Sequence, residues 1–324
     1  MMRRLPIRER QRGVAVITAL LLTTLAITIV ASLFWQQQVQ VRSIENQRLQ
    51  LQKQWILRGA LDWGRLILRA DGINSRTDTL DEPWAVPLAE TRLDQYVENG
   101  RADADASDAS LSGDIVDAQS RYNLANLCWD KTANVCERGE FNPAELAVFA
   151  RLLSSVQLSP ALANALADAM IASQIRVEGD TPGTDKARPI GFEHIEDLLA
   201  VPGFSAEVIE KLKEFIIFLP AKGATALNVN TAPAEVLAAR IDTLSLADAN
   251  VLVASRKTAS FLNTGDFINR LQGKSLGDAD SKIDIKTSFF LVNGKVRMNR
   301  AGLEVQALIQ RQGPRTTLIW IREN

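Results

Sequence analysis

Few side chains in this sequence have the types and spacing that catalysis requires. The chain has one histidine, His194, and two cysteines, Cys128 and Cys136. A catalytic histidine dyad, a poly-histidine metal centre or a zinc ribbon needs more of these residues. A catalytic thiol also needs a base beside it, and no second histidine-like base exists. We find no nucleophile motif or glycine-rich phosphate loop in the sequence, so we expect a protein that is not an enzyme.

The two cysteines are close in sequence. Seven residues separate Cys128 from Cys136 in the segment CWDKTANVC. In an oxidising compartment this spacing favours a disulfide, which would stabilise the fold by about 2–3 kcal/mol by restricting the unfolded chain. Two buried free thiols are the alternative.

A glycine hairpin near the histidine suggests a second kind of chemistry. The segment HIEDLLAVPGFSAEVIEKL predicts two helices joined at Pro202–Gly203, and it resembles the helix-hairpin-helix of DNA-binding proteins. Backbone amides at such a hairpin can hold a phosphate, but duplex binding also needs surrounding Lys and Arg. Residues 186–274 contain ten basic and ten acidic residues. This balance favours a packing role, and a membrane-anchored DNA receptor is kept as the alternative function.

The N-terminal region predicts a membrane span. Residues 14–41 carry no charge, and the apolar part is the 22 residues 14–35. As a helix they reach roughly 33 Å, enough to cross a ~30 Å hydrocarbon core. Five arginines and one glutamate precede the span, so the positive-inside rule places the N-terminus in the cytoplasm and the rest of the chain outside it. A cleaved secretory signal is the alternative, but the apolar run is too long and no A-x-A site follows.

The remaining elements must be built around this segment. The helical pattern continues without proline, which predicts one helix from about Val14 to Ala70, ended by Asp71–Gly72. Residues 128–275 have helical periodicity, whereas residues 283–324 have strand character. In that last region Asn293–Gly294 is a hairpin signal, and two more strands flank a Gly-Pro turn.

These patterns predict an α+β fold. The long N-terminal helix would cover an antiparallel sheet built from the terminal strands and a strand near Ile115, with an all-α domain inserted between them. A length of 324 residues suits about two domains, and 37 basic against 38 acidic residues give no global case for nucleic-acid binding.

The N-terminus is similar to a known class of signal. A basic leader ending in Arg12–Gly13, followed directly by an uncharged helix, resembles the class III signal of type IV pilins and type II secretion pseudopilins. The resemblance implies that a prepilin peptidase cuts between Gly13 and Val14 and methylates the new N-terminus. Most members have glutamate at mature position five, where this sequence has Thr18. Within the pseudopilins that departure is typical of the large minor member, the general secretion pathway protein K family. The segments GDIVDAQSRYNLANLC and ALNVNTAPAEVLAARI also resemble that family.

The resemblance implies a pseudopilin fold with a large inserted α-domain containing helix-hairpin-helix-like elements. The expected parts are a cleaved leader, a transmembrane assembly helix, a first pseudopilin part, the inserted α-domain and the C-terminal strands, at residues 1–13, 14–35, 36–127, 128–280 and 281–324.

The implied function is that of a minor pseudopilin at the tip of the type II secretion pseudopilus. It would initiate filament assembly for the export of folded proteins across the outer membrane. Expected partners are the I- and J-type minor pseudopilins, the major pseudopilin, the prepilin peptidase and the inner-membrane assembly platform, with no nucleic acid. The chain would cross the inner membrane once, with its bulk in the periplasm.

Relatives in this family often hold calcium in the α-domain. The matching run begins at Asp168, but two of the three expected acids are replaced, by Ile171 and Ser173. Calcium needs six to eight oxygen ligands. Glu178, Asp180 and Asp185 could rebuild part of the site, and a solvated loop is the alternative.

Overall fold

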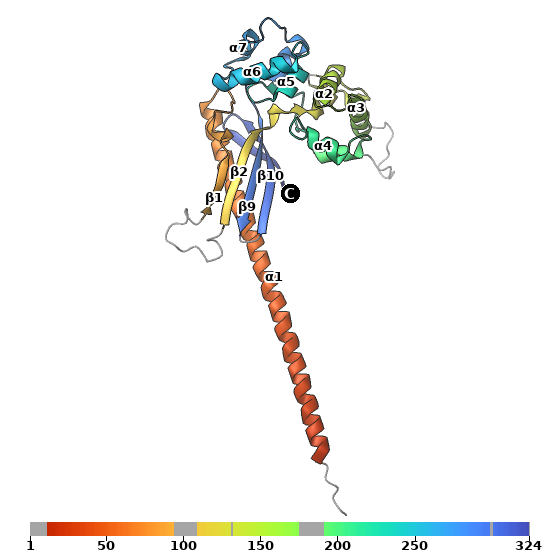
Figure 1. The fold of residues 1–324 in the computed structure, drawn as a ribbon, viewed down its shortest axis with the longest axis vertical. Helices are drawn as coiled ribbons and strands as arrows, with labels where there is room; N and C mark the ends of the chain where they lie inside the picture. The colour runs from red at the N-terminus through yellow and green to blue at the C-terminus, as the bar shows by residue number, and fades with distance from the viewer. Residues whose placement is uncertain (1–11, 94–108, 131, 175–190, 299–300, 324) are drawn as a thin grey trace, which may run out of the picture. The chain divides into compact units, whose positions relative to one another are not determined.

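The computed structural model describes residues 12–93, 109–130, 132–174, 191–298 and 301–323 (Figure 1). The chain divides into two compact units, Met1–Ile56 and Leu57–Asn324.

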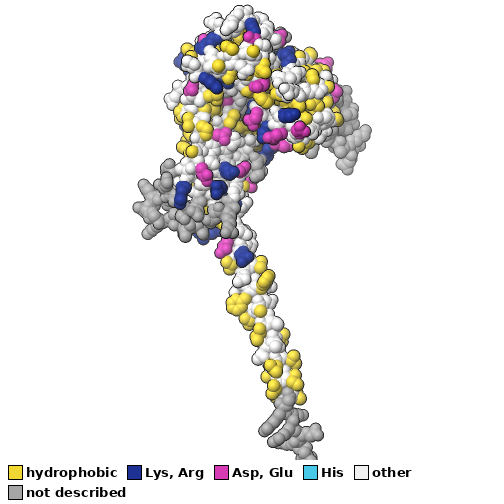
Figure 2. All heavy atoms as spheres, in the orientation of Figure 1, with side chains coloured by type: hydrophobic (Ala, Val, Ile, Leu, Met, Phe, Trp, Pro, Cys, Tyr) yellow, Lys and Arg dark blue, Asp and Glu magenta, His cyan; other side chains and the backbone are white. Residues whose placement is uncertain are grey.

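In the first unit the described residues belong to one helix, α1 (Arg12–Asn74), which continues into the second unit. The apolar part of α1, residues 14–35, exposes large apolar side chains on all sides of the helix. For example, Leu22 is 66% exposed and Phe34 is 65% exposed. Figure 2 shows hydrophobic side chains, and no Lys, Arg, Asp or Glu, on the visible face of this part. Among the described residues, α1 is the one helix long and apolar enough to cross a membrane. A helix that is apolar on every side is suited to lipid or to other apolar helices.

The end of α1 differs from the prediction. The helix continues through Asp71 and Gly72 to Asn74, and the Ser75 amide donates to the Asp71 carbonyl oxygen at 2.8 Å. Gly72 is explained by packing, because a Cβ there would lie 2.5 Å from the carbonyl oxygen of Gly313. The glycine therefore permits a close approach between α1 and a strand turn, and it does not end the helix.

The second unit contains a five-stranded antiparallel sheet in the order β1-β2-β9-β10-β11. The strands are β1 (Leu88–Arg92), β2 (Ala109–Asp117), β9 (Phe289–Met298), β10 (Ala301–Gln312) and β11 (Arg315–Glu323). The strand expected near Ile115 and the strand pair around the Gly-Pro turn are therefore confirmed.

The hairpin expected at Asn293–Gly294 is wrong. Strand β9 runs through both residues, and its Met298 pairs with Ala301 of β10. A Cβ at Gly294 would lie 3.3 Å from Cδ2 of Leu57 on α1. Gly294 thus lies where a side chain of α1 approaches the sheet, which a turn-based interpretation of Asn-Gly does not consider.

Helices fill the sequence between β2 and β9, as the periodicity predicted. They are α2 (Pro143–Ser155), α3 (Ala161–Gln174), α4 (Ala206–Leu212), α5 (Ala234–Arg240), α6 (Leu246–Thr258) and α7 (Thr264–Asn269). The 3-10 turns in the described part of the chain are Pro83–Ala85, Ala118–Ser120, Leu124–Cys128, Cys136–Arg138, Ile195–Ala200 and Gly277–Lys282. Three two-stranded pairs complete the unit: β3 (Tyr122–Asn123) with β6 (Ile216–Ile217), β4 (Trp129–Asp130) with β5 (Ala133–Asn134), and β7 (Leu227–Asn228) with β8 (Ile283–Asp284).

The segment expected as a helix before Pro202 is a 3-10 turn, Ile195–Ala200, instead of an α-helix. The hairpin glycine, Gly203, has φ +93°, and a Cβ on it would lie 2.7 Å from Cδ2 of Leu162 on α3. The hairpin therefore packs against α3 inside the helical region.

The two faces of the sheet are buried by different elements. On one face Leu61 and Leu68 of α1 pack with Phe290, Val292 and Ile309. On the other face a separate apolar cluster joins Phe289, Leu291 and Leu308 to the chain around Ile217 and Leu219. The helical region has its own larger core. Helix α1 thus covers one face of the sheet, and the segment around Ile217 and Leu219 covers part of the other, in agreement with the predicted α+β fold.

Candidate functional site

The proposed processing and assembly residues lie at the start of α1. Gly13 and Val14 are in its first turns, and the leader residues 1–11 lie outside the described residues. The hydroxyl of Thr18 lies 3.0 Å from the carbonyl oxygens of both Val14 and Ala15, to which it donates. The hydroxyls of Thr23, Thr24 and Thr28 likewise donate to carbonyl oxygens of their own helix. The hydroxyl protons of these threonines are satisfied without any partner subunit, which keeps this part of α1 compatible with an apolar surrounding.

The expected disulfide is confirmed. Cys128 and Cys136 are bonded, and their Cα atoms are 4.9 Å apart. Both side chains are buried in the core of the helical region, and the β4–β5 hairpin spans the loop between them. The bond closes a short loop next to the first helix of the insert.

The candidate calcium site stays a prediction. Asp168 is exposed on α3, and Glu178, Asp180 and Asp185 lie outside the described residues. His194, the only histidine, packs its ring edge-to-face on Trp320 of β11 with centroids 5.4 Å apart.

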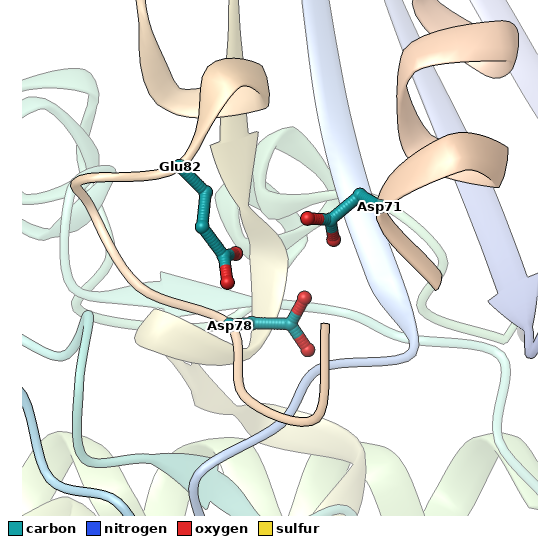
Figure 3. A group of neighbouring side chains, drawn as sticks. All are labelled: Asp71, Asp78 and Glu82. Carbon is teal, nitrogen blue, oxygen red and sulfur yellow. The ribbon is translucent and has the colours of Figure 1, made fainter. Parts of the chain in front are cut away.

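Sequence reasoning missed an acidic group at the end of α1. Carboxylate oxygens of Asp71, Asp78 and Glu82 lie within 4.8 Å of one another (Figure 3). Burial and the neighbouring Glu82 raise the pKa of Asp71 to about 6. The guanidinium of Arg311 on β10 donates to both Asp71 and Asp78, while Glu82 accepts the Trp84 indole N–H at 2.6 Å. An oxygen set of this kind could hold a cation, but here an arginine already supplies the positive charge. The group therefore ties the end of α1 to β10.

A second missed network joins the sheet to the insert. Asp117, at the end of β2, is 1% exposed. Its carboxylate accepts from the Gln119 amide at 2.7 Å, from Nδ2 of Asn228 at 2.8 Å and from Oγ1 of Thr231 at 2.6 Å. Burial raises the pKa of Asp117 to about 6, although these hydrogen bonds favour the ionised form. Asn228 and Thr231 belong to the segment ALNVNTAP, so that segment is held to the sheet by hydrogen bonds.

A third network holds the insert together. Glu145 on α2 is fully buried, and its carboxylate accepts hydrogen bonds from both terminal nitrogens of Arg240, at 2.8 and 2.9 Å. The Lys282 ammonium lies 2.8 Å from the same carboxylate. Burial acts to raise the pKa of Glu145, but the two cations outweigh it and hold the pKa below its ordinary value. Removing one member would leave a buried charge without compensation.

None of these networks had a clear signal in the sequence. Their members are separated by 95 residues for Arg240 and Glu145, and by 233 for Arg311 and Asp78. Buried polar pairs at such separations follow no periodicity, so only the folded chain reveals them.

A long helix that is apolar at its N-terminal end, packed on an antiparallel sheet that carries a helical insert, defines a membrane-anchored pseudopilin-type protein. Comparison with known proteins makes the class specific. A family model described as "Type II secretion system (T2SS), protein K" matches residues 227–286, and another with the same description matches residues 120–221, so together they cover half of the chain. The chain belongs to the type II secretion system protein K family.

Individual relatives agree with this assignment. A type II secretion system protein K of Pseudomonas aeruginosa is 27% identical over 94% of this chain and 90% of its own length. That of Klebsiella pneumoniae is 23% identical, with 94% of each chain covered. The fold is similar to a chain in the crystal structure of the GspK-GspI-GspJ complex from enterotoxigenic Escherichia coli, with a TM-score of 0.64, 18% identity, and 86% of this chain and 98% of that chain covered. The chain is thus a minor pseudopilin of type II secretion, a structural component from a family of proteins that are not enzymes.

Proposed function

We propose that this protein forms the tip of the type II secretion pseudopilus and initiates assembly of the filament that exports folded proteins across the outer membrane. In this proposal the prepilin peptidase removes residues 1–13 and methylates Val14. Residues 14–35 anchor the protein in the inner membrane, and the bulk of the chain lies in the periplasm. The physical basis of the proposal is that the apolar part of α1 can exchange lipid for other helices with little loss of apolar burial.

The observation that carries the proposal is Thr18. An ionised carboxylate in an apolar bundle is costly unless a cation pairs with it. A glutamate at this position would therefore seek the terminal ammonium of a neighbouring subunit. Thr18 instead donates to Val14 and Ala15 of its own helix, so it needs no such partner. The subunit that has no neighbour ahead of it is the one at the tip.

The proposed partners follow from the solved relative, which was crystallised as a GspK-GspI-GspJ complex. We expect this chain to assemble with the I- and J-type minor pseudopilins of its own organism, and the resulting complex to engage the major pseudopilin and the assembly platform.

Co-purification tests the assembly directly. The full chain, carrying an affinity tag at its C-terminus, is co-expressed with the I- and J-type proteins and extracted in mild detergent. The proposal predicts a ternary complex that survives size-exclusion chromatography. A tagged chain that elutes alone, with both other proteins present in the extract, would contradict it.

The alternative of a DNA receptor is not favoured by the hairpin around Gly203. Within residues 191–215, which the structure describes, six acidic side chains face two lysines, a net charge of −4 before the histidine is considered. A surface of this sign repels phosphate instead of releasing counterions. If the protein bound duplex DNA with an affinity that falls steeply as salt is added, the receptor function would be favoured instead.

A further inference from the structure

A small cavity in the insert is lined by more cationic than anionic side chains. It has a volume of about 90 Å³ and lies between α2, the end of α5 and the 3-10 turn Gly277–Lys282. The charged residues on its wall are Arg151, Arg240, Asp242 and Lys282. With the Glu145 carboxylate bound to Arg240 and Lys282, the described side chains at the cavity are three cations and two carboxylates, a net charge of +1.

Two of these cations have unused donors. The Nε of Arg151 donates to the Ala239 carbonyl oxygen at 2.9 Å. Its two terminal nitrogens meet no acceptor among the residues that the structure describes. Arg240 is 5% exposed, and its buried Nε also has no hydrogen-bond partner within the described chain. A buried donor without an acceptor is unfavourable, and a guanidinium fork is suited to two oxygens of one group.

The carboxylates already present do not fill this role. Both oxygens of Glu145 are occupied by Arg240, and one of them also by Lys282. Asp242 interacts electrostatically with Arg151 but forms no ion pair with it in the described part of the chain. Burial lowers the pKa of Arg151, so its charged form would gain from an anion at close range.

We propose that this cavity binds one oxyanion group, a carboxylate or a phosphate, with the Arg151 fork as its main contact and Lys282 as a second cation. The volume admits a single small group and excludes a larger ligand body. Such a group could be a free anion or the carboxylate of an acidic peptide from a partner protein. The chemistry is the same in both cases, and the experiment distinguishes the two sources.

The test uses the full chain in detergent. Inorganic phosphate is titrated at constant ionic strength, with chloride as the balancing anion, and the midpoint of thermal unfolding is followed. In a second arm, isothermal calorimetry measures binding of a short peptide that ends in a free aspartate, against the same peptide with both carboxyl groups amidated. Arg151→Gln is the test variant. Arg151→Lys keeps the charge without the fork, and Arg138→Gln removes an exposed arginine elsewhere in the insert.

The proposal predicts saturable binding to the wild type and to R138Q, at least tenfold weaker binding to R151Q, and an intermediate loss in R151K. Phosphate binding alone would identify a free anion, whereas tighter binding of the free-carboxylate peptide would identify a protein ligand. Two outcomes would overturn the proposal: equal responses in all four proteins, or no saturable binding of either probe. These readouts do not depend on pseudopilus assembly, so they stand apart from the proposed tip function.

Discussion

Gly113 of β2 and Gly294 of β9 lie directly opposite each other in the sheet. Leu57 of α1 approaches the sheet at this pair, because a Cβ on Gly294 would lie 3.3 Å from its Cδ2. A side chain at Gly294 would therefore press on α1, whereas one at Gly113 would meet the backbone of β9.

The two glycines predict different tolerances to substitution. A Cβ at Gly113 would lie 2.4 Å from the backbone carbonyl oxygen of Asn293, whereas one at Gly294 would lie 3.3 Å from a flexible leucine side chain. We expect Gly113→Ala to lower the free energy of unfolding by roughly 2–4 kcal/mol, and Gly294→Ala by about 1 kcal/mol. Chemical denaturation of both variants, compared with the wild type, measures this. Equal losses would show that the backbone contact at Gly113 does not limit the packing.

Asp117 predicts an unusual pH dependence. Its folded pKa of about 6 lies above the ordinary value of 3.8, so the folded state holds the proton more tightly than the unfolded state. The stabilisation from this proton is complete below pH 3.8 and is lost as the pH rises through 6, by up to about 3 kcal/mol. The difference in unfolding free energy between the wild type and Asp117→Asn should therefore grow in favour of the wild type as the pH falls from 7 to 4.

Thermal unfolding of both proteins across this pH range provides the measurement. Because Asp117 is buried, added salt should leave the difference nearly unchanged. Parallel profiles for the two proteins would show that the carboxyl group does not change its protonation in this window.

The buried ion pair of the insert predicts that a double variant is less harmful than a single one. Glu145→Gln leaves Arg240 and Lys282 with an uncompensated charge, and should cost about 3–5 kcal/mol. Replacing Glu145 and Arg240 together by methionine removes the pair and should cost less than either single methionine variant. A double-mutant cycle measured by chemical denaturation tests this, and strictly additive losses would contradict coupling between the two residues.

The elements that depend on local patterns could be predicted from the sequence. The apolar run from Val14, the helical period of the insert and the spacing of Cys128 and Cys136 each reflect a constraint within a short segment. The predictions at Asn293–Gly294 and at Gly72 were wrong, because a distant part of the chain approaches each glycine. Turn statistics describe the residues next to a glycine, and they contain nothing about an approaching helix or a second loop.

The polar networks could not be predicted from the sequence, for a related reason. Arg311 meets Asp71 and Asp78, and Asp117 meets Asn228, only because the first and last parts of the chain share one sheet. The segment containing Asn228 and Thr231 was recognised by family resemblance, and the structure adds the contact that these residues make.

Thr18 predicts an asymmetric response to substitution. Thr18→Glu introduces a carboxylate that needs a cation from a subunit ahead, and the tip position offers none. We expect secretion by a strain carrying only this variant to fall at least tenfold. Thr18→Val has nearly the same shape and no carboxylate, so it should secrete at the wild-type level. Measurement of secreted protein at matched expression tests both, and normal secretion with T18E would argue against a tip position without a neighbour.

Intact-protein mass spectrometry of the mature chain, purified from membranes that contain prepilin peptidase, tests the central claim most directly. The account predicts a polypeptide that begins at Val14, carries one added methyl group and keeps the whole apolar helix. An unprocessed leader, or a chain cut on the far side of the span beyond Trp35, would contradict it.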